Sequence, residues 1–395
     1  MNSTRQRAIL TGAVATLILA GTALAANSGW TVVSSPNVTN ANYLYGSAAI
    51  SASSAWAVGY MYNRSIQSTL TERWNGTDWS VVPSPNPDTQ GRCGAGYSGN
   101  ALTGVSAASA NDVWAVGSIC GWEPQTLAEH WTGTKWAVVS TPNESGAQNS
   151  MLAGVAAVSS NDVWAVGNFQ EGGGVYQWNT LIEHWDGTQW TIVNSPNVTG
   201  ADRNILNAVA AVSSTDIWAV GYSETNITDV PLIEHYDGQS WSIVASVYPP
   251  PSAFNQLYAV AAISSDDVWA VGYENENSSG VYGGALTEHW DGTSWSLVDG
   301  PFLGSAINLF GIAAVSSDDV WAVGDASNGA LGFDDHPITE HWDGTKWSSV
   351  STPDPGQAAE LLSATTANGT VWAIGAYSAT AGITLANPMT LTLKR

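Results

Sequence analysis

One phrase, Asp-Val-Trp-Ala-Val-Gly or a close variant, returns along the chain at intervals of 50 to 58 residues. A second phrase, Glu-His-Trp-Asp-Gly-Thr-x-Trp or a variant of it, follows most copies. A regular period of this length is typical of a repeat architecture, in which each repeat is one supersecondary unit. Residues 28–395 are therefore expected to fold as a single repeat domain. The tryptophan of the first phrase stands at Trp56, Trp114, Trp164, Trp218, Trp269, Trp321 and Trp372.

Each repeat predicts four short strands. In the fourth repeat, an apolar run at 206–212 is followed by a Ser-Ser-Thr-Asp turn and a second strand at 217–221. A third strand at 232–236 leads through Asp-Gly, a hairpin signal, into a fourth at 241–244. Four antiparallel strands in about fifty residues are typical of one blade of a β-propeller. No apolar period of 3.6 residues indicates a helical solenoid instead.

The two ends of the repeat region complement each other. The last repeat has predicted strands at 361–367, 371–375 and 389–393 but lacks a fourth. The missing element, Trp-x-x-Val-x-Ser-Pro-Asn, stands at residues 30–37. We therefore predict an all-β, seven-bladed propeller of four-stranded antiparallel blades. The strand within residues 29–36 completes the last blade, because closing the ring removes exposed sheet edges.

Residues 1–25 are typical of a secretory signal peptide. Arg5 and Arg7 precede an apolar run at 8–20, and Ala-Leu-Ala at 23–25 offers a cleavage site. An uncleaved membrane anchor is the alternative. Cleavage removes two arginines and no acidic residue, so the formal charge falls from −23 to −25. This charge argues against nucleic acid and anionic membranes as partners. We expect a secreted monomer, soluble after cleavage, with a glycan or an extracellular protein as its ligand.

The chain has two cysteines, Cys93 and Cys120, both in the second repeat. In an exported protein such a pair predicts a disulfide. Antiparallel pairing of the first two strands of this repeat is expected to bring the two residues together.

Residues 28–395 resemble secreted bacterial β-propellers of the kelch and Asp-box type. The resemblance rests on the blade length, on Asp-Val-Trp-Ala-Val-Gly and on Asp-Gly-Thr-x-Trp. The kelch diglycine after the second strand is absent, and the segment from Trp185 to Trp190 does not have the Asp-box spacing. The resemblance implies the fold alone, because propellers of this kind include lectins, hydrolases, oxidases and interaction scaffolds.

The histidine of the second phrase occurs only in repeats that also have the aspartate of the first. The first repeat has Ser54 and Arg73 at these positions, and the last has Thr370 and Lys394. We interpret this joint presence as a buried Asp–His hydrogen bond within each blade, similar to the network of WD-repeat propellers. A metal site is the alternative, but ligands on separate blades cannot converge on one ion. No catalytic residue, metal or cofactor is assigned. The five pairs are Asp112–His130, Asp162–His184, Asp216–His235, Asp267–His289 and Asp319–His341.

The repeat also accounts for nineteen of the 21 tryptophans. These are expected to pack between neighbouring blades with their indole N–H groups hydrogen-bonded. Trp122 and Trp178 fall outside the repeat pattern and are therefore candidates for ligand contact.

Ligand-binding residues are expected in the connections that vary between repeats. Two connections of each repeat are short and uniform, whereas the other two vary and emerge together on one face of the propeller. Varied loops on a rigid scaffold are the usual carriers of binding. The candidates on this face are Trp122, Glu171, Tyr176, Trp178, Arg203, Glu224, Asp229, Glu274, Asp334, Asp335 and His336.

Three functions are compatible with this surface. The leading interpretation is a non-catalytic binding module, since acidic side chains with exposed aromatics suit sugars and protein surfaces. A carbohydrate-active enzyme, either a hydrolase or a lyase, is the second. It requires a suitably spaced carboxylate pair, drawn from Glu171, Glu224, Glu274 and Asp334. The third is a structural cell-surface scaffold.

Overall fold

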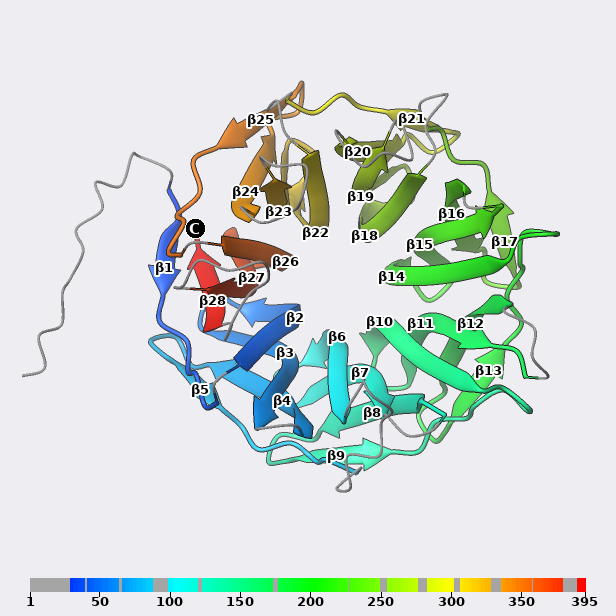
Figure 1. The fold of residues 1–395 in the computed structure, drawn as a ribbon, viewed down its shortest axis with the longest axis horizontal. Coiled ribbons are helices and arrows are strands. Elements are labelled where there is room, and N and C mark those ends of the chain that lie inside the picture. Colours follow the sequence, from blue (N-terminus) through cyan, green and yellow to red (C-terminus); the bar gives the residue numbers. More distant parts are fainter. Residues whose placement is uncertain are drawn as a thin grey trace, which may run out of the picture.

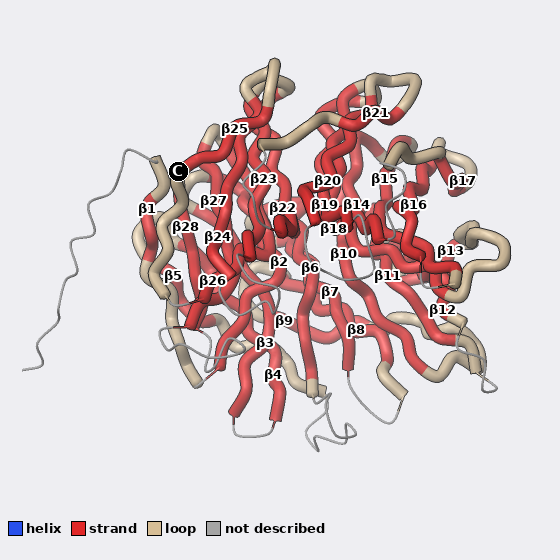
Figure 2. Tube along the Cα trace, turned by 45° about the horizontal axis from the view of Figure 1, so that its top comes forward, coloured by secondary structure: helices blue, strands red, loops and turns tan. Residues whose placement is uncertain are grey.

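The computed structural model describes residues 29–39, 41–63, 66–87, 99–119, 123–172, 177–226, 228–248, 254–275, 283–301, 306–327, 335–356, 358–378 and 389–395. These residues form strands and connections, and none of them is helical (Figure 2). No helix of this described part is long and apolar enough to cross a membrane. The predicted signal peptide at 1–25 lies outside the described residues, as do Cys93 and Cys120.

The strands form four-stranded antiparallel sheets, here called blades, around a common axis (Figure 1). Within each of the first six blades the strands follow in chain order, from the axis to the rim. The described residues contain 28 strands, a number that fits seven blades. Three successive blades are also joined into one sheet, β10 to β21, by the single parallel bridges Trp178–Arg203 and Asp229–Phe254.

The first three blades contain β2 (Ala41–Ser51), β3 (Ser54–Asn63), β4 (Ile66–Trp74) and β5 (Trp79–Val81); β6 (Asn100–Ser109), β7 (Asp112–Ile119), β8 (Gln125–Trp131) and β9 (Trp136–Val139); and β10 (Asn149–Ser159), β11 (Asp162–Gln170), β12 (Trp178–Trp185) and β13 (Trp190–Val193). The next three contain β14 (Arg203–Ser213), β15 (Asp216–Thr225), β16 (Thr228–Tyr236) and β17 (Trp241–Val244); β18 (Phe254–Ser264), β19 (Asp267–Asn275), β20 (Gly283–Trp290) and β21 (Trp295–Leu297); and β22 (Ala306–Ser316), β23 (Asp319–Ser327), β24 (Asp335–Trp342) and β25 (Trp347–Val350). The last contains β26 (Ala358–Ala367), β27 (Thr370–Ser378), β28 (Met389–Lys394) and β1 (Thr31–Val33).

The N-terminal strand β1 pairs with the C-terminal strand β28. The two strands are antiparallel, with Thr31 opposite Lys394 and Val33 opposite Thr392. The hydroxyl of Thr392 also donates a hydrogen bond of 2.6 Å to the carbonyl oxygen of Val33. Residues more than 350 positions apart in the sequence therefore share one blade (Figure 1).

The glycine that ends the first phrase is required by the close approach of two strands. At Gly221 a Cβ atom would lie 1.9 Å from the carbonyl oxygen of Ile205 on β14. The pairing shifts by one residue at this place, between Leu206 and Ala208. A β-bulge of this kind brings backbones together and excludes any side chain. Similar contacts, of 1.8 to 2.0 Å, recur at Gly59, Gly117, Gly167, Gly272, Gly324 and Gly375.

The tryptophans pack between neighbouring blades. The ring centroid of Trp114 on β7 lies 4.9 Å from that of Trp185 and 5.2 Å from that of Trp190, both in the following blade. The prediction that the indole N–H groups are all hydrogen-bonded is wrong. Among the described residues, Trp114 Nε1 and eleven other buried indole nitrogens have no hydrogen-bond partner. The rings of Trp114 and Trp190 meet at 88°, so the edge of one indole faces the electron-rich face of another.

Candidate functional site

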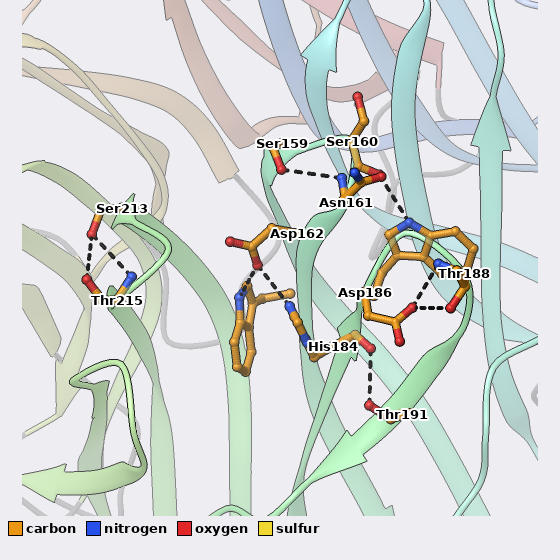
Figure 3. Close-up of polar contacts among 12 residues, drawn as sticks. Ser159, Ser160, Asn161, Asp162, His184, Asp186, Thr188, Thr191, Ser213 and Thr215 are labelled. Atoms are coloured by element: carbon orange, nitrogen blue, oxygen red, sulfur yellow. Dashed lines mark hydrogen bonds and ion pairs between the residues drawn. The ribbon is translucent and has the colours of Figure 1, made fainter.

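The Asp–His pairs lie at the end of the blades where the short, uniform turns connect the strands. Asp162 Oδ1 lies 2.9 Å from His184 Nε2 and also accepts a hydrogen bond of 2.9 Å from Trp164 Nε1 (Figure 3). The imidazole of His184 packs on the indole of Trp164, with ring centroids 4.3 Å apart. The structure brings the Asp–His pair together in the other four blades as well, with each imidazole packed on the phrase tryptophan. The distances are 2.7 Å for Asp112–His130, and 2.9 Å for Asp216–His235, Asp267–His289 and Asp319–His341.

These pairs are half-buried, which corrects the expectation that they are buried. The side chain of His184 is 27% exposed and that of Asp162 is 19% exposed. The indole of Trp164 covers one face of the imidazole, and the neighbouring turn leaves the pair within reach of water. No group of three or more His, Cys, Asp and Glu side chains suited to a metal ion occurs in the described part of the chain.

Where the Asp–His pair is absent, a cation takes the place of the histidine. The guanidinium carbon of Arg73 lies 5.5 Å from the ring centroid of Trp56, and Lys394 Nζ lies 5.0 Å from that of Trp372. Each cation stands opposite its tryptophan in the strand pairing, as the histidines do. Imidazole stacking and cation–π contact are thus two ways to cover the same indole. On this face, an indole covered by an imidazole or by a cation therefore recurs from blade to blade.

The candidates on the opposite, variable face lie mainly at strand ends, which corrects their expected place in loops. Glu224 on β15 pairs with Asp229 on β16, and the hairpin between them closes with Asn226 at a φ of 50°. The second and third strands continue past the glycine of the phrase because their pairing is uninterrupted. Trp178, Arg203 and Asp335 open β12, β14 and β24; His336 follows Asp335, and Glu274 lies in β19. Trp122, Tyr176 and Asp334 lie outside the described residues.

One group of candidates meets at the boundary of the third, fourth and fifth blades. Arg203 Nε lies 3.3 Å from Glu224 Oε2, and Arg203 also forms the strand bridge with Trp178. Asp229 is 5% exposed, and its Oδ2 accepts a hydrogen bond of 2.5 Å from Gln256 Nε2 on β18. These contacts link three blades on the variable face.

Glu171 and His336 have local partners of their own. Glu171 Oε1 accepts a hydrogen bond of 2.7 Å from Asn179 Nδ2. His336 Nδ1 lies 2.7 Å from Asp354 Oδ2. Neither residue shares a hydrogen bond or an ion pair with the Arg203 group within the described part of the chain, so the predicted candidates do not form one cluster there.

The first strands of the blades enclose a cavity of about 200 Å³ on the axis. One layer of its wall comes from a single position of the repeat, the unpaired residue of the β-bulge in each first strand. That position is aromatic in three blades, at Tyr45, Tyr258 and Phe310. In the other blades it holds Thr103, Ala153, Asn207 and Leu362. The cavity therefore has a wall whose chemistry changes from blade to blade.

Carboxyl groups with raised pKa lie near the variable-face end of this cavity. Burial raises the pKa of Asp325 to about 7, although Asn308 Nδ2 donates a hydrogen bond of 2.8 Å to its Oδ1. Burial, with a further contribution from the charge of Asp325, raises the pKa of Glu360 to about 7. Burial also raises the pKa of Asp229. Groups with a pKa near neutrality are common at functional sites.

Tyrosines flank these carboxyl groups. The hydroxyls of Tyr45 and Tyr60 lie 3.2 Å apart, and the two rings stack with centroids 5.4 Å apart. Burial, with a smaller contribution from the charge of Glu360, raises the pKa of Tyr45 to about 12. On the other side, Tyr258 Oη donates a hydrogen bond of 2.9 Å to Gln256 Oε1. We call the ends of the first two strands that carry these aromatic and acidic residues the channel mouth.

Sequence reasoning missed the channel mouth because it sought diversity only in the connections. A signal was nevertheless present, since the residue after the glycine of each phrase changes along the chain. The residue at this position pairs with one residue of the first strand of its blade, as Tyr60 does with Tyr43, Tyr273 with Gln256, and Asp325 with Asn308. The residues at this position are Tyr60, Ser118, Asn168, Tyr222, Tyr273, Asp325 and Ala376.

A buried glutamate before each histidine was also missed. Glu234 is 0% exposed, and burial raises its pKa to about 8. Its partner is Ser195, in the Ser-Pro-Asn segment that ends the preceding blade. Glu288 has the same relation to Ser246, at 2.8 Å. Burial raises the pKa to about 8 at Glu72, Glu129 and Glu183, and to about 7 at Glu288 and Glu340.

Comparison with known proteins supports the fold. No protein-family model matches the chain, and no curated protein matches its sequence. Among solved structures, the chain is similar to YCF48 bound to a D1 peptide, with 12% identity and a TM-score of 0.52 over 92% of this chain and 96% of that one. The chain is a β-propeller. Its finer resemblance to kelch and Asp-box propellers stays a prediction.

Two further structures show the same likeness. Puromycin hydrolase has 10% identity and a TM-score of 0.54 over 86% of this propeller and 51% of the hydrolase. A protein of unknown function from Dyadobacter fermentans has 9% identity and a TM-score of 0.50 over 92% of this propeller and 97% of that chain. At such low identities these similarities concern the fold alone.

Proposed function

We propose that the chain is a secreted, non-catalytic binding propeller that takes up a glycan or a protein segment at the channel mouth. Its seven blades form a ring closed by β1. The pairing of β1 with β28 and the number of strands support this ring. The proposed secretion rests on the sequence of residues 1–25.

The observation that carries this proposal is the contrast between the two faces. One face repeats the same Asp–His or cation contact on the phrase tryptophan from blade to blade. At the other, the layer of Tyr45, Tyr258 and Phe310 differs between blades and lies close to buried carboxyl groups. Varied side chains presented by a rigid scaffold are the usual carriers of binding. The YCF48 structure adds that a propeller of similar fold holds a peptide.

Glycan and peptide arrays probed with the purified protein test the proposal. Any ligand found is then titrated against Tyr258→Ala and Phe310→Ala, with Thr191→Ala on the opposite face as the control. We expect the first two variants to weaken binding at least tenfold and the control to bind as the parent does. A ligand whose affinity is unchanged by both mouth variants places binding elsewhere and contradicts the proposal.

A second candidate function is favoured by the carboxyl groups of the mouth. Asp325 and Glu360 influence each other electrostatically, and both have a pKa near 7, which suits general acid–base chemistry. A carbohydrate-active enzyme would use such a pair. Product analysis after incubation with each array hit separates the two functions. Turnover that Glu360→Gln abolishes would replace the binding proposal with the enzymatic one.

A further inference from the structure

We propose that the channel mouth binds an alkylammonium group, which enters the cavity beside Tyr45 and Tyr258 and is held by the carboxylates of Asp325 and Glu360. This inference rests on the proposed binding function and names the chemistry of its ligand. The group can belong to a free amine or to a lysine side chain, and the experiment below separates these two sources.

Asp325 and Glu360 carry negative charge that no described cation compensates. At this end of the blades, Arg203 pairs with Glu224 and not with Asp325 or Glu360. Asp325 and Glu360 have no cationic partner among the described ion pairs, and the charge of Asp325 further raises the pKa of Glu360. Neighbouring buried carboxylates without a counter-ion favour a cation over a neutral or anionic ligand.

Asp229, at the same end of the blades, is a buried carboxyl with an unsatisfied oxygen. Its side chain is 5% exposed, and its Oδ1 has no hydrogen-bond partner among the described residues, while Gln256 holds Oδ2. Its charge acts on Tyr258, a residue of the cavity wall. A buried acceptor left half satisfied is costly. The charge of Arg203 offsets only part of that cost, because burial still raises the pKa of Asp229, and a further cation would offset more of it.

The size and lining of the cavity also suit an alkylammonium group. Tyr45, Tyr258 and Phe310 line it, and aromatic rings attract ammonium groups through their electron-rich faces. Its volume of about 200 Å³ lies below the range of roughly 300–1,000 Å³ typical of sites for drug-sized ligands. One amine with a short alkyl chain suits this space better than an oligosaccharide does.

Binding of a cation here has a measurable consequence for protons. Burial holds the pKa of Asp325 and Glu360 near 7, so part of each group is protonated at neutral pH. An ammonium ion lowers both pKa values, and protons are released on binding. The charge of Asp335 on β24 also raises the pKa of both groups, whereas Tyr43 and Tyr45 on β2, whose pKa burial raises to about 12, stay uncharged at neutral pH. A neutral sugar would cause no such release.

The test is calorimetric titration of the purified protein with n-butylammonium chloride and, as its neutral isostere, n-butanol. We expect the amine to bind at least tenfold more tightly than the alcohol. Glu360→Gln and Asp325→Asn should each weaken amine binding at least fivefold. Glu123→Gln makes the same change of charge at an exposed residue before β8 and should leave binding unchanged. Equal binding of amine and alcohol overturns the proposal, as does equal binding by all variants.

Two further measurements complete the test. Titration at pH 6.5 in buffers of different ionisation enthalpy should show proton release on amine binding, and its absence contradicts the role of Asp325 and Glu360. A Gly-Lys-Gly peptide with blocked ends is compared with butylammonium. Tighter binding of the peptide indicates a lysine side chain, and tighter binding of the amine indicates a free ligand. If amines fail while array ligands still depend on Tyr258, the ammonium inference fails and the binding function stands.

Discussion

Ser195 Oγ donates a hydrogen bond of 2.9 Å to Glu234 Oε2 across the boundary between two blades. The carboxyl is 0% exposed, and burial, opposed by this hydrogen bond, raises its pKa to about 8. A neutral, protonated carboxyl is far cheaper to bury than a carboxylate. The last blade has the buried Leu393 at this position, opposite Ala373 on β27, which shows that an uncharged side chain fits there.

The buried glutamates predict that the propeller is most stable in mild acid. Their pKa lies at about 7 to 8 in the folded chain, against 4.5 for an unperturbed glutamate. A raised pKa contributes stability that is complete below pH 4.5 and is lost as the pH rises through 8. We therefore expect the melting temperature to fall between pH 5 and pH 8.5 in differential scanning calorimetry. A melting temperature that rises over this range would contradict the protonated state of these groups.

Substitution of one such glutamate by its neutral isostere should remove part of this pH dependence. Glu234→Gln is expected to raise the melting temperature at pH 8.5 by a few degrees and to leave it unchanged at pH 5, because glutamine resembles the protonated acid. Glu123→Gln, at an exposed site, should have no effect at either pH. A loss of stability at both values would mean that Glu234 is ionised in the folded protein.

The Asp–His contact is expected to show strong coupling. Asp216→Ala and His235→Ala should each cost roughly 1–3 kcal/mol, because either leaves its partner without the hydrogen bond of 2.9 Å. The double variant should cost less than the sum by about 1 kcal/mol. Urea unfolding of the four proteins measures this difference, and additive losses would refute the pairing.

In the first blade, the contact of Arg73 with Trp56 should be replaceable by the Asp–His pair of the other blades. Arg73→His alone removes the cation from Trp56 and should cost about 1 kcal/mol. Adding Ser54→Asp supplies the aspartate found in five other blades and should restore the loss. Thermal melting checks both steps. If the double variant is no more stable than Arg73→His, the two arrangements are not interchangeable.

The bulge glycine is expected to be far more sensitive than an exposed one. Gly221→Ala forces a Cβ atom to within 1.9 Å of the Ile205 carbonyl oxygen and should cost about 3 kcal/mol. Gly200→Ala meets no atom within 4 Å and strains only a positive φ, at roughly 1 kcal/mol. Equal destabilisation in urea unfolding would remove the steric explanation of the phrase.

Some features of this molecule can be predicted from its sequence, and others cannot. The blades are predictable because the strand and turn signals around Trp164 recur at a regular interval along the chain. The Asp162–His184 pair is predictable because the aspartate and the histidine occur only in the same repeats. Glu224 and Asp229 were misplaced in a loop because no local signal marks how far paired strands extend. Glu234 was missed since its partner Ser195 lies in another repeat, and the cavity wall at Tyr258 depends on how separate blades meet.

The residue after the glycine of each phrase is the first position at which the residue type differs widely between repeats. Tyr60 stacks with Tyr45, and Tyr273 with Tyr258, so substitutions at this position reach the cavity wall directly. The strand pairing on which the ring depends uses the preceding glycine and the phrase before it. A combinatorial library confined to the half-buried members of this position, Tyr60, Ser118, Tyr222 and Tyr273, would thus diversify recognition with little disturbance of the core, which makes the chain a scaffold for engineered receptors.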